Sequence, residues 1–220
     1  MKKTTKLVAA GLAAATLAVT AGFTAVDGHG HHDHKHAMTA EVGTTAPNFT
    51  LADLDGNEHT LQTWIDEGKT VVIEWFNPEC PFVVKQHERN STMKDTYDFA
   101  KKHGGDDLVW IAINSGAPGK QGAGIEKNKG YAEKWDLAYP ILVDESGKVG
   151  KMYAARTTPH MYIINGEGTL VYAGAIDNNS SPTKAGDVNY VKAALKQVFA
   201  GETVTTATTR PYGCSVKYAK

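Results

Sequence analysis

Cysteine is scarce in this chain of 220 residues, which contains only Cys80 and Cys214. Two cysteines are far fewer than a disulfide-stapled scaffold needs, so the fold must depend on its hydrophobic core. The Cys-x-x-Cys arrangement is absent as well, because Val83 stands three residues after Cys80. Disulfide chemistry must therefore join Cys80 to Cys214 or involve a thiol from outside the chain.

The first residues lack an apolar run long enough to cross a bilayer comfortably. The run Leu7–Val19 follows three lysines and precedes the small residues Thr20 and Ala21. A short apolar stretch between positive charge and small residues is typical of a secretory signal peptide, and a retained membrane anchor is the alternative. We expect residues 1–21 to be a signal peptide that is cleaved after Ala21, leaving a periplasmic or secreted protein.

Neither sign of charge dominates the chain. It has 23 Lys and Arg against 24 Asp and Glu, and cleavage removes three lysines, so 20 against 24 leaves a net charge of −4. This mild acidity argues against nucleic acids and anionic membranes as partners. Export also predicts an oxidising compartment, where disulfides persist.

Histidine is concentrated in one segment that has no apolar periodicity. Within residues 22–40, which we expect to be a disordered linker, five histidines fall close together: His29, His31, His32, His34 and His36. Flexible imidazoles at this density can bind Zn²⁺ or Cu²⁺, although their spacing fits no preorganised site. The alternative is a soluble linker with incidental metal affinity, and we expect no cofactor to be required.

The rest of the chain predicts one α/β domain over residues 41–200 and an extended tail over 201–220. Apolar runs predict strands at 70–76, 108–113, 139–143, 160–164 and 169–175, and helices at 63–67, 81–103, 125–136, 147–155 and about 188–199. A hairpin precedes them, with its turn at Asp55-Gly56. The polar stretch Lys85–Thr92 suggests that the helix beginning at Pro81 is kinked or solvent-facing there. This order resembles the thioredoxin fold, with a central mixed sheet flanked by helices.

Cys80 follows the apolar run Val71–Phe76 and precedes Pro81. Because proline suits the first turn of a helix, this pattern places the Cys80 thiol at a helix N-terminus. The helix dipole and unpaired N–H groups at that position favour the thiolate, the reactive form of cysteine. An inert buried thiol is the alternative.

Four motifs resemble the peroxiredoxin-like, or redoxin (AhpC/TSA-type), branch of the thioredoxin superfamily. They are the opening Val42–Leu51, the strand leading to Cys80-Pro-Phe-Val83, the Thr158-Pro159 loop, and the ending Gly213-Cys-Ser-Val-Lys217. The likeness covers residues 41–220. The Cys-Pro-Phe-Val motif with a distant Gly-Cys-Ser-Val-Lys is similar to a subgroup of exported redoxins with a lone active-site cysteine, whereas the other two motifs mark only the superfamily.

The resemblance implies roles for individual residues. Cys80 matches the nucleophile, and Glu74 matches a buried carboxylate that accepts a proton; a lysine-paired carboxylate is the alternative for Glu74. Pro159 matches a cis-proline beside the active-site sulfur, with an ordinary trans turn as the alternative, and Thr158 would offer backbone groups to an extended substrate. His87 we expect to be a solvated side chain rather than a base.

A peroxidase site is less well matched. The Thr and Pro that precede a peroxidatic cysteine by three and seven residues are replaced by Asn77 and Ile73. In the alternative alignment, the position of the peroxidatic cysteine itself is occupied by Val83. Nothing in the sequence therefore predicts that a peroxide is activated.

Three functions remain from the sequence. The favoured one is an exported thiol–disulfide oxidoreductase, in which Cys80 attacks the disulfide of a protein or small molecule, Cys214 resolves the mixed disulfide, and a periplasmic reductant restores the thiols. The second is a non-catalytic module for metal handling or partner binding with a structural Cys80–Cys214 disulfide. The third is a thiol peroxidase.

Overall fold

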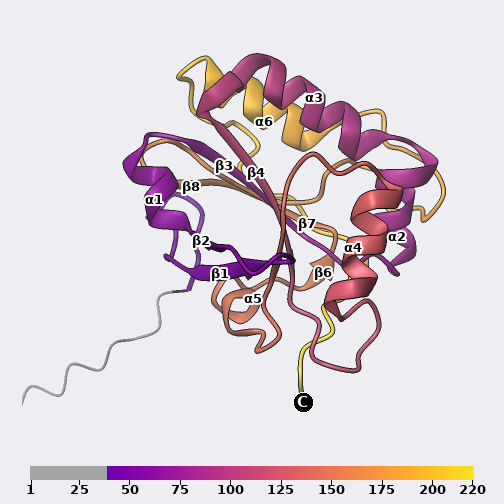
Figure 1. Cartoon of the computed structure of the whole chain (residues 1–220). Helices are drawn as coiled ribbons and strands as arrows, with labels where there is room; N and C mark the ends of the chain where they lie inside the picture. The colour runs from indigo at the N-terminus through magenta and orange to yellow at the C-terminus, as the bar shows by residue number, and fades with distance from the viewer. Residues whose placement is uncertain (1–38) are drawn as a thin grey trace, which may run out of the picture. The chain divides into compact units, whose positions relative to one another are not determined.

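The computed structural model describes residues 39–220 of the chain (Figure 1). The expected signal peptide and the five clustered histidines lie outside the described residues. Among residues 39–220, no helix combines the length and the apolar character needed to span a membrane.

A seven-stranded mixed sheet forms the centre of the described domain, in the order β2-β1-β5-β4-β3-β7-β8. Strands β3, β4 and β5 run parallel, whereas β3–β7, β7–β8, β1–β5 and β1–β2 pair antiparallel. The mixed sheet predicted from the sequence is therefore confirmed, with its antiparallel hairpin at the end of the strand order. The strands are β1 (Thr50–Asp53), β2 (Glu58–Thr60), β3 (Thr70–Trp75), β4 (Leu108–Asn114), β5 (Ile141–Val143), β7 (His160–Ile164) and β8 (Leu170–Gly174).

Helices cover both faces of this sheet. Figure 1 shows α3 and α6 side by side across one face, and α1 and α5 pack with the apolar core on the other. The helices are α1 (Leu61–Asp66), α2 (Pro81–Val84), α3 (Thr92–Gly104), α4 (Ile125–Lys134), α5 (Lys148–Met152) and α6 (Tyr190–Phe199). Two short turns complete the set, the π-helical η1 (Lys85–Arg89) and the 3₁₀-helical η2 (Gly105–Asp107).

Strand β3 is buried along its whole length, and its side chains alternate between two cores. Val71 and Ile73 join the core beneath α1 and α5, whereas Val72 joins the core beneath α3 and α6. Alternation therefore directs Glu74, which is fully buried, to the same side as Val72. Cys80 lies in the segment that follows the carboxyl end of this strand.

The single helix expected over residues 81–103 is wrong, because the structure divides it. Helix α2 has only four residues and continues into η1, and the chain then breaks at Ser91, whose φ is +51°. A π turn holds more residues per turn than an α-helix, so it turns Lys85 and Gln86 inward, and both are fully buried. The expectation of a kink was right, but these two polar side chains do not face solvent.

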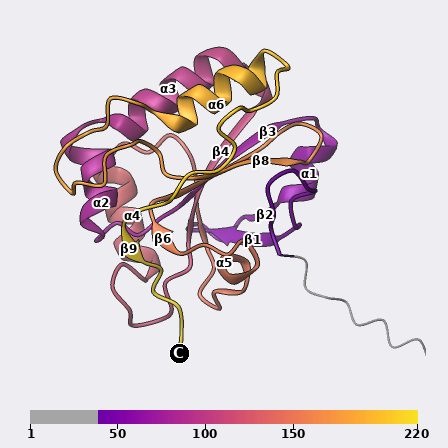
Figure 2. The same cartoon turned by 180° about the vertical axis from the view of Figure 1, so that it is seen from behind.

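The C-terminal segment returns to the Cys80 region as a second, two-stranded sheet. Strand β9 (Cys214–Ser215) pairs antiparallel with β6 (Thr157–Thr158), and Figure 2 shows the two side by side. The tail is extended, as the sequence predicted. It is also attached to the domain along its length, which the sequence did not indicate.

Candidate active site

Cys80 is positioned by the loop that leaves β3. Its backbone N–H donates to the Asn77 carbonyl at 3.0 Å, and the Asn77 side chain accepts from the Glu79 N–H at 3.0 Å. These bonds close a tight turn immediately before Cys80, which keeps extended backbone angles as the N-cap of α2. Pro81 occupies the first helical position, where its missing N–H costs nothing. The local chemistry of the sequence therefore accounts for the placement of Cys80.

The Cys80 thiol is fully buried and makes one hydrogen bond. It donates to the carbonyl oxygen of Thr158 at 3.0 Å. The Thr158–Pro159 peptide is cis, which is the form that the resemblance implied. Cys80, Thr158 and Pro159 therefore meet at one point in the structure.

Cys214 reaches the same point from the other end of the chain. The register of the small sheet places it directly opposite Thr158, and its side chain packs against the cluster that contains Cys80. Both cysteines are free thiols in this structure, with Cys80 buried and Cys214 partly exposed. Burial, and then the adjacent Cys80 side chain, raises the pKa of Cys214 well above its usual range. Cys214 is therefore held as a protonated thiol at neutral pH.

Gly213 makes this approach of the tail possible. Its φ is +140°, a conformation that side chains disfavour, and a Cβ placed there would lie 2.1 Å from the Thr158 carbonyl oxygen. In the sequence, Gly213 stood out only as part of the Gly-Cys-Ser-Val-Lys motif. A glycine directly before a lone distant cysteine was the available signal for a close backbone approach.

Glu74 pairs with His87, which lies in η1, directly after the helix α2 that begins at Pro81. The His87 Nε2 lies 3.0 and 3.1 Å from the two Glu74 carboxylate oxygens, and the two side chains are only 3% and 0% exposed. The expectation of a solvated His87 is therefore wrong, and the alternative of a lysine partner for Glu74 is not what the structure shows. The π turn is the physical reason, because it brings His87 inward above β3.

Aromatic rings hold the His87 imidazole in place. It stacks on Trp135 with ring centres 4.8 Å apart and planes 9° apart, and it meets Phe76 edge-on at 5.7 Å. Tyr139 lines the same hollow as His87 and Trp135, and burial and then the charge of Glu74 raise the pKa of its phenol well above the usual value. A carboxylate, an imidazole and a phenol are thus enclosed together.

A second buried polar cluster attaches the tail two residues before Cys214. The Tyr212 hydroxyl donates to the Asp177 carboxylate and accepts from Lys85 Nζ at 3.1 Å and Gln86 Nε2 at 2.8 Å. Lys85 Nζ also lies 3.5 Å from Asp177 and donates to the Asn179 carbonyl at 2.6 Å. The sequence does not indicate this cluster, because a Lys-Gln pair in a helix is usually exposed.

The loop after β4 forms one wall of the site. Gln121 accepts from the Asn77 side-chain amide through its carbonyl at 3.1 Å, and the Gly122 N–H donates to the Glu79 carboxylate at 2.7 Å. Lys127 pairs with the same carboxylate at 3.0 Å, and hydrogen bonds from Lys127 and Gly122 lower the pKa of Glu79. Glu79 therefore carries a negative charge next to Cys80.

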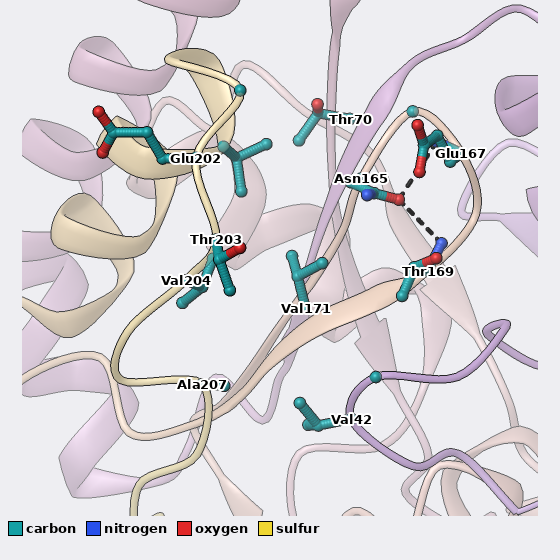
Figure 3. Close-up of a pocket in the computed structure, with 14 residues that line it drawn as sticks. Val42, Thr70, Asn165, Glu167, Thr169, Val171, Glu202, Thr203, Val204 and Ala207 are labelled. Atoms are coloured by element: carbon teal, nitrogen blue, oxygen red, sulfur yellow. Dashed lines mark hydrogen bonds between the residues drawn. The ribbon is translucent and has the colours of Figure 1, made fainter.

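The pocket drawn in Figure 3 lies elsewhere. It encloses about 560 Å³ between the β7–β8 turn and the segment after α6, and Thr70, at the opposite end of β3 from Cys80, contributes to it. Neither cysteine is among its lining residues. Over the described part of the chain, no group of three or more His, Cys, Asp or Glu side chains is arranged to hold a metal ion.

The chain is similar in sequence to known redox proteins. The profile of the redoxin family matches residues 41–195. The thiol-disulfide oxidoreductase ResA of Geobacillus kaustophilus (strain HTA426) is 33% identical over 138 residues, which are 61% of this chain and 71% of the relative. The chloroplastic peroxiredoxin Q of Sedum lineare is 33% identical over 163 residues, 68% of this chain and 77% of the relative.

Two solved structures resemble the fold over most of its length. A hypothetical protein from Sinorhizobium meliloti 1021 is 30% identical, with a TM-score of 0.70 over 82% of this chain and 96% of that one. An uncharacterized conserved protein from Geobacillus kaustophilus is 28% identical, with a TM-score of 0.69 over 81% and 93%. A putative protein disulfide isomerase from Bacteroides thetaiotaomicron, at 22% identity and a TM-score of 0.50, shares the fold. The α/β fold is thioredoxin-like, as the sequence predicted.

Proposed function

We propose that this chain, which belongs to the redoxin family, is an exported thiol–disulfide oxidoreductase that uses Cys80 as nucleophile and Cys214 as resolving cysteine. The name of the ResA relative supports the class of reaction. The observation that carries the proposal is the convergence of both cysteines on Thr158, whose carbonyl accepts from the Cys80 thiol and whose β-partner is Cys214.

The proposed reaction transfers two electrons from the chain to a substrate disulfide. Cys80, as thiolate, attacks one sulfur, so that a Cys80–substrate disulfide forms and the first substrate thiolate leaves. Cys214 then loses its proton and attacks the Cys80 sulfur. The second substrate thiolate leaves, both substrate thiols take up protons, and Cys80 and Cys214 are left joined. An outside dithiol in the exported compartment reduces this bond and is itself oxidised.

The remaining site residues have supporting roles in this scheme. We assign Glu74 as proton acceptor, because it is a buried carboxylate near the end of β3, the strand that leads to Cys80, and has a fixed partner in His87. Thr158 and Pro159 position the Cys80 sulfur through the Thr158 carbonyl. Burial, and then the adjacent Cys80 side chain, raises the pKa of Cys214, which disfavours Cys214 as the first nucleophile.

The reduction potential of the Cys80–Cys214 couple tests the proposal. We expect equilibration with glutathione or dithiothreitol buffers, read by thiol labelling and mass spectrometry, to give a value above about −300 mV, in the range of working couples. A value below about −300 mV would identify a structural bridge and remove the proposed cycle.

Matched serine variants test the order of the two cysteines. With a substrate disulfide, Cys214→Ser should accumulate a mixed disulfide on Cys80, because nothing resolves it. Cys80→Ser should accumulate much less, because burial still raises the pKa of the Cys214 thiol in this variant. The opposite pattern would reverse the assigned roles.

The histidine segment supports a second candidate function, a non-catalytic protein that handles Zn²⁺ or Cu²⁺. Its five histidines lie between residues 29 and 36, outside the described residues. Titration with Zn²⁺ and Cu²⁺ of the full chain and of a variant lacking residues 27–36 tests whether this segment binds metal. Unchanged zinc and copper affinity on deletion would exclude a metal role for this segment.

A thiol peroxidase is the third candidate, and the name of the peroxiredoxin Q relative supports it. The positions that would activate the peroxide hold Asn77 and Ile73, which argue against it. Oxidation of Cys80 to sulfenic acid no faster than that of free cysteine would dispose of this candidate.

A further inference from the structure

The C-terminal segment covers the thiol that the proposed function requires to react. Cys80 has no exposed surface, although a substrate disulfide must reach its sulfur. Gly213 lies against the Thr158 carbonyl, and Cys214 packs on the Cys80 cluster and pairs with Thr158. Access to Cys80 therefore depends on how firmly this segment is held.

Tyr212 is the best-anchored residue of the segment before Cys214. Its hydroxyl uses its one proton on Asp177 and accepts from both Lys85 and Gln86, which satisfies its full hydrogen-bonding capacity. Lys85 Nζ also lies 4.9 Å from the centre of the Tyr212 ring. The anchor thus consists of charged and polar groups that each make a hydrogen bond to the Tyr212 hydroxyl, and Lys85 and Gln86 are held by further bonds to the Asn179 carbonyl and the Asp177 carboxylate.

The same anchor contacts the helix that carries Cys80. Lys85 and Gln86 lie in η1, directly after α2, and Phe82 of α2 meets the Tyr212 ring at 6.0 Å. The segment Thr209–Gly213 also lines a polar hollow of about 620 Å³ together with Thr157 and Asp177. The tail before Cys214 is therefore tied to the domain at Tyr212 and borders open space beside it.

We propose that Tyr212 is a positioning residue that latches the tail on Asp177, Lys85 and Gln86, and that opening of this latch exposes Cys80 to its substrate while closing presents Cys214 for resolution. The inference rests on the proposed function for its purpose. The latch itself is a property of the reduced chain and can be measured without any substrate. Asp177, Lys85 and Gln86 act through Tyr212, and none of them touches either sulfur in the described contacts.

The test compares Tyr212→Phe with Tyr153→Phe in a full-length Cys214→Ser background, where Cys80 is the only thiol. Tyr153 is the control because its buried hydroxyl donates to the Pro47 carbonyl at 2.6 Å, away from the tail. We expect Tyr212→Phe to raise the alkylation rate of Cys80 at least tenfold, because it removes hydrogen bonds to charged groups. Tyr153→Phe should change the rate by less than twofold.

The unfolding midpoint of each variant in urea separates a latch from general destabilisation. If the Tyr212 hydroxyl only supported overall stability, its loss would accelerate the alkylation of Cys80 only in proportion to global unfolding. Equal alkylation rates in the two variants, or a rise that the fall in stability explains, would therefore overturn the proposal. If Tyr212→Phe does not fold, hydrogen exchange of the unaltered chain decides. The Val216 amide, which donates to the Arg156 carbonyl at 3.1 Å, should then exchange at least tenfold faster than the Val72 amide in β3.

The two proposals can fail separately. A Cys80–Cys214 potential below about −300 mV with a latch-dependent alkylation rate would retain the latch and reject the redox cycle. A working potential with no effect of Tyr212→Phe would retain the cycle and reject the latch.

Discussion

Glu74 and His87 form a buried pair in which each side chain depends on the other for a hydrogen bond. Both side chains are almost completely enclosed, and the imidazole is fixed by its stack on Trp135. Removing one partner of a buried pair leaves the other without compensation, which costs far more than losing an exposed ion pair. The pair therefore stabilises the helix junction at η1 as well as the proposed proton acceptor.

His87→Ala should lower the free energy of unfolding by about 3–5 kcal/mol, since it leaves the Glu74 carboxylate buried without its partner. Urea denaturation at neutral pH measures this change. His103→Ala, at an exposed histidine of α3, should change stability by no more than about 0.5 kcal/mol.

Adding Glu74→Gln to His87→Ala should recover part of the loss, because the uncompensated group is then neutral. Strict additivity of the two substitutions would contradict a coupled pair.

Single residues could be predicted from the sequence where local chemistry decides their position. Cys80 was placed by the pattern of strand, Cys-Pro and helix, and the buried position of Glu74 was implied by the resemblance to the thioredoxin superfamily. His87 was not, because an α-helical period places it outward and only the π turn reverses that. Gly213 was not, because its conformation is required by Thr158, a residue distant in the sequence.

At the scale of elements, the pairing of β6 with β9 brings Cys214 to Thr158, whose carbonyl accepts from the Cys80 thiol. Each strand has only two residues, so the pair depends on neighbouring contacts. The Ala117 N–H donates to the Lys217 carbonyl at 2.8 Å, and the Tyr218 hydroxyl donates to the Ala155 carbonyl at 2.9 Å. The small sheet is thus secured after Cys214 as well as before it.

Gly213→Ala should displace this sheet, because the new methyl group meets the Thr158 carbonyl and the backbone angle is unfavourable. We expect a stability loss of about 1–3 kcal/mol and at least tenfold slower formation of the Cys80–Cys214 disulfide with oxidised glutathione.

Gly201→Ala is the matched control for this substitution. Gly201 also has a positive φ, +69°, but no atom lies within 4 Å of the added methyl group. It should cost about 1–2 kcal/mol and leave disulfide formation unchanged. Equal slowing in both variants would show that backbone strain, and not the contact with Thr158, is responsible.

Elements with strong periodicity were predictable, and the junctions between them were not. The β7–β8 hairpin and helix α6 form where the apolar pattern placed them. The break at Ser91 has no proline or glycine to mark it and arises from the buried contacts of Lys85, Gln86 and His87. Such contacts depend on partners from other parts of the chain, which a local pattern does not contain.

For the whole molecule, His160 makes folding depend on pH. It follows the cis-proline directly, and burial, then the charge of Arg156, lowers the pKa of its imidazole to about 3. The Tyr162 hydroxyl donates to the Tyr153 carbonyl at 2.8 Å, so at 3.0 Å it accepts from His160 Nδ1. The neutral imidazole with its proton on Nδ1 is therefore the form that the fold stabilises.

The unfolded chain should bind this proton near pH 6.5, well above the value of about 3 in the folded chain. The contribution of His160 to stability is therefore complete above pH 6.5 and is lost as the pH falls towards 3, by up to about 1.4 kcal/mol per pH unit. Urea denaturation between pH 7 and pH 4 should show a steeper fall for the unaltered chain than for His160→Gln. Parallel curves would assign the pH dependence to other groups.

The whole fold was predictable because many weak signals agree on it. Buried strands alternate with helices, and a final hairpin and helix complete the order that the structure shows. The course of the tail was not predictable, since the stretch before Cys214 carries few apolar residues and its attachment relies on Asp177 and on backbone groups. The position of the tail is therefore set by the residues that it contacts and not by its own sequence pattern.

The pairing of Cys214 with Thr158 also removes a cost that chain length would otherwise impose. Two cysteines more than a hundred residues apart meet rarely in a flexible chain, because loop closure becomes less probable as the loop lengthens. Here the backbone register fixes the second thiol beside the first, so its effective concentration is set by β6 and β9 and not by the intervening sequence. Insertions in surface loops between the two cysteines should therefore leave the rate at which they react with each other unchanged.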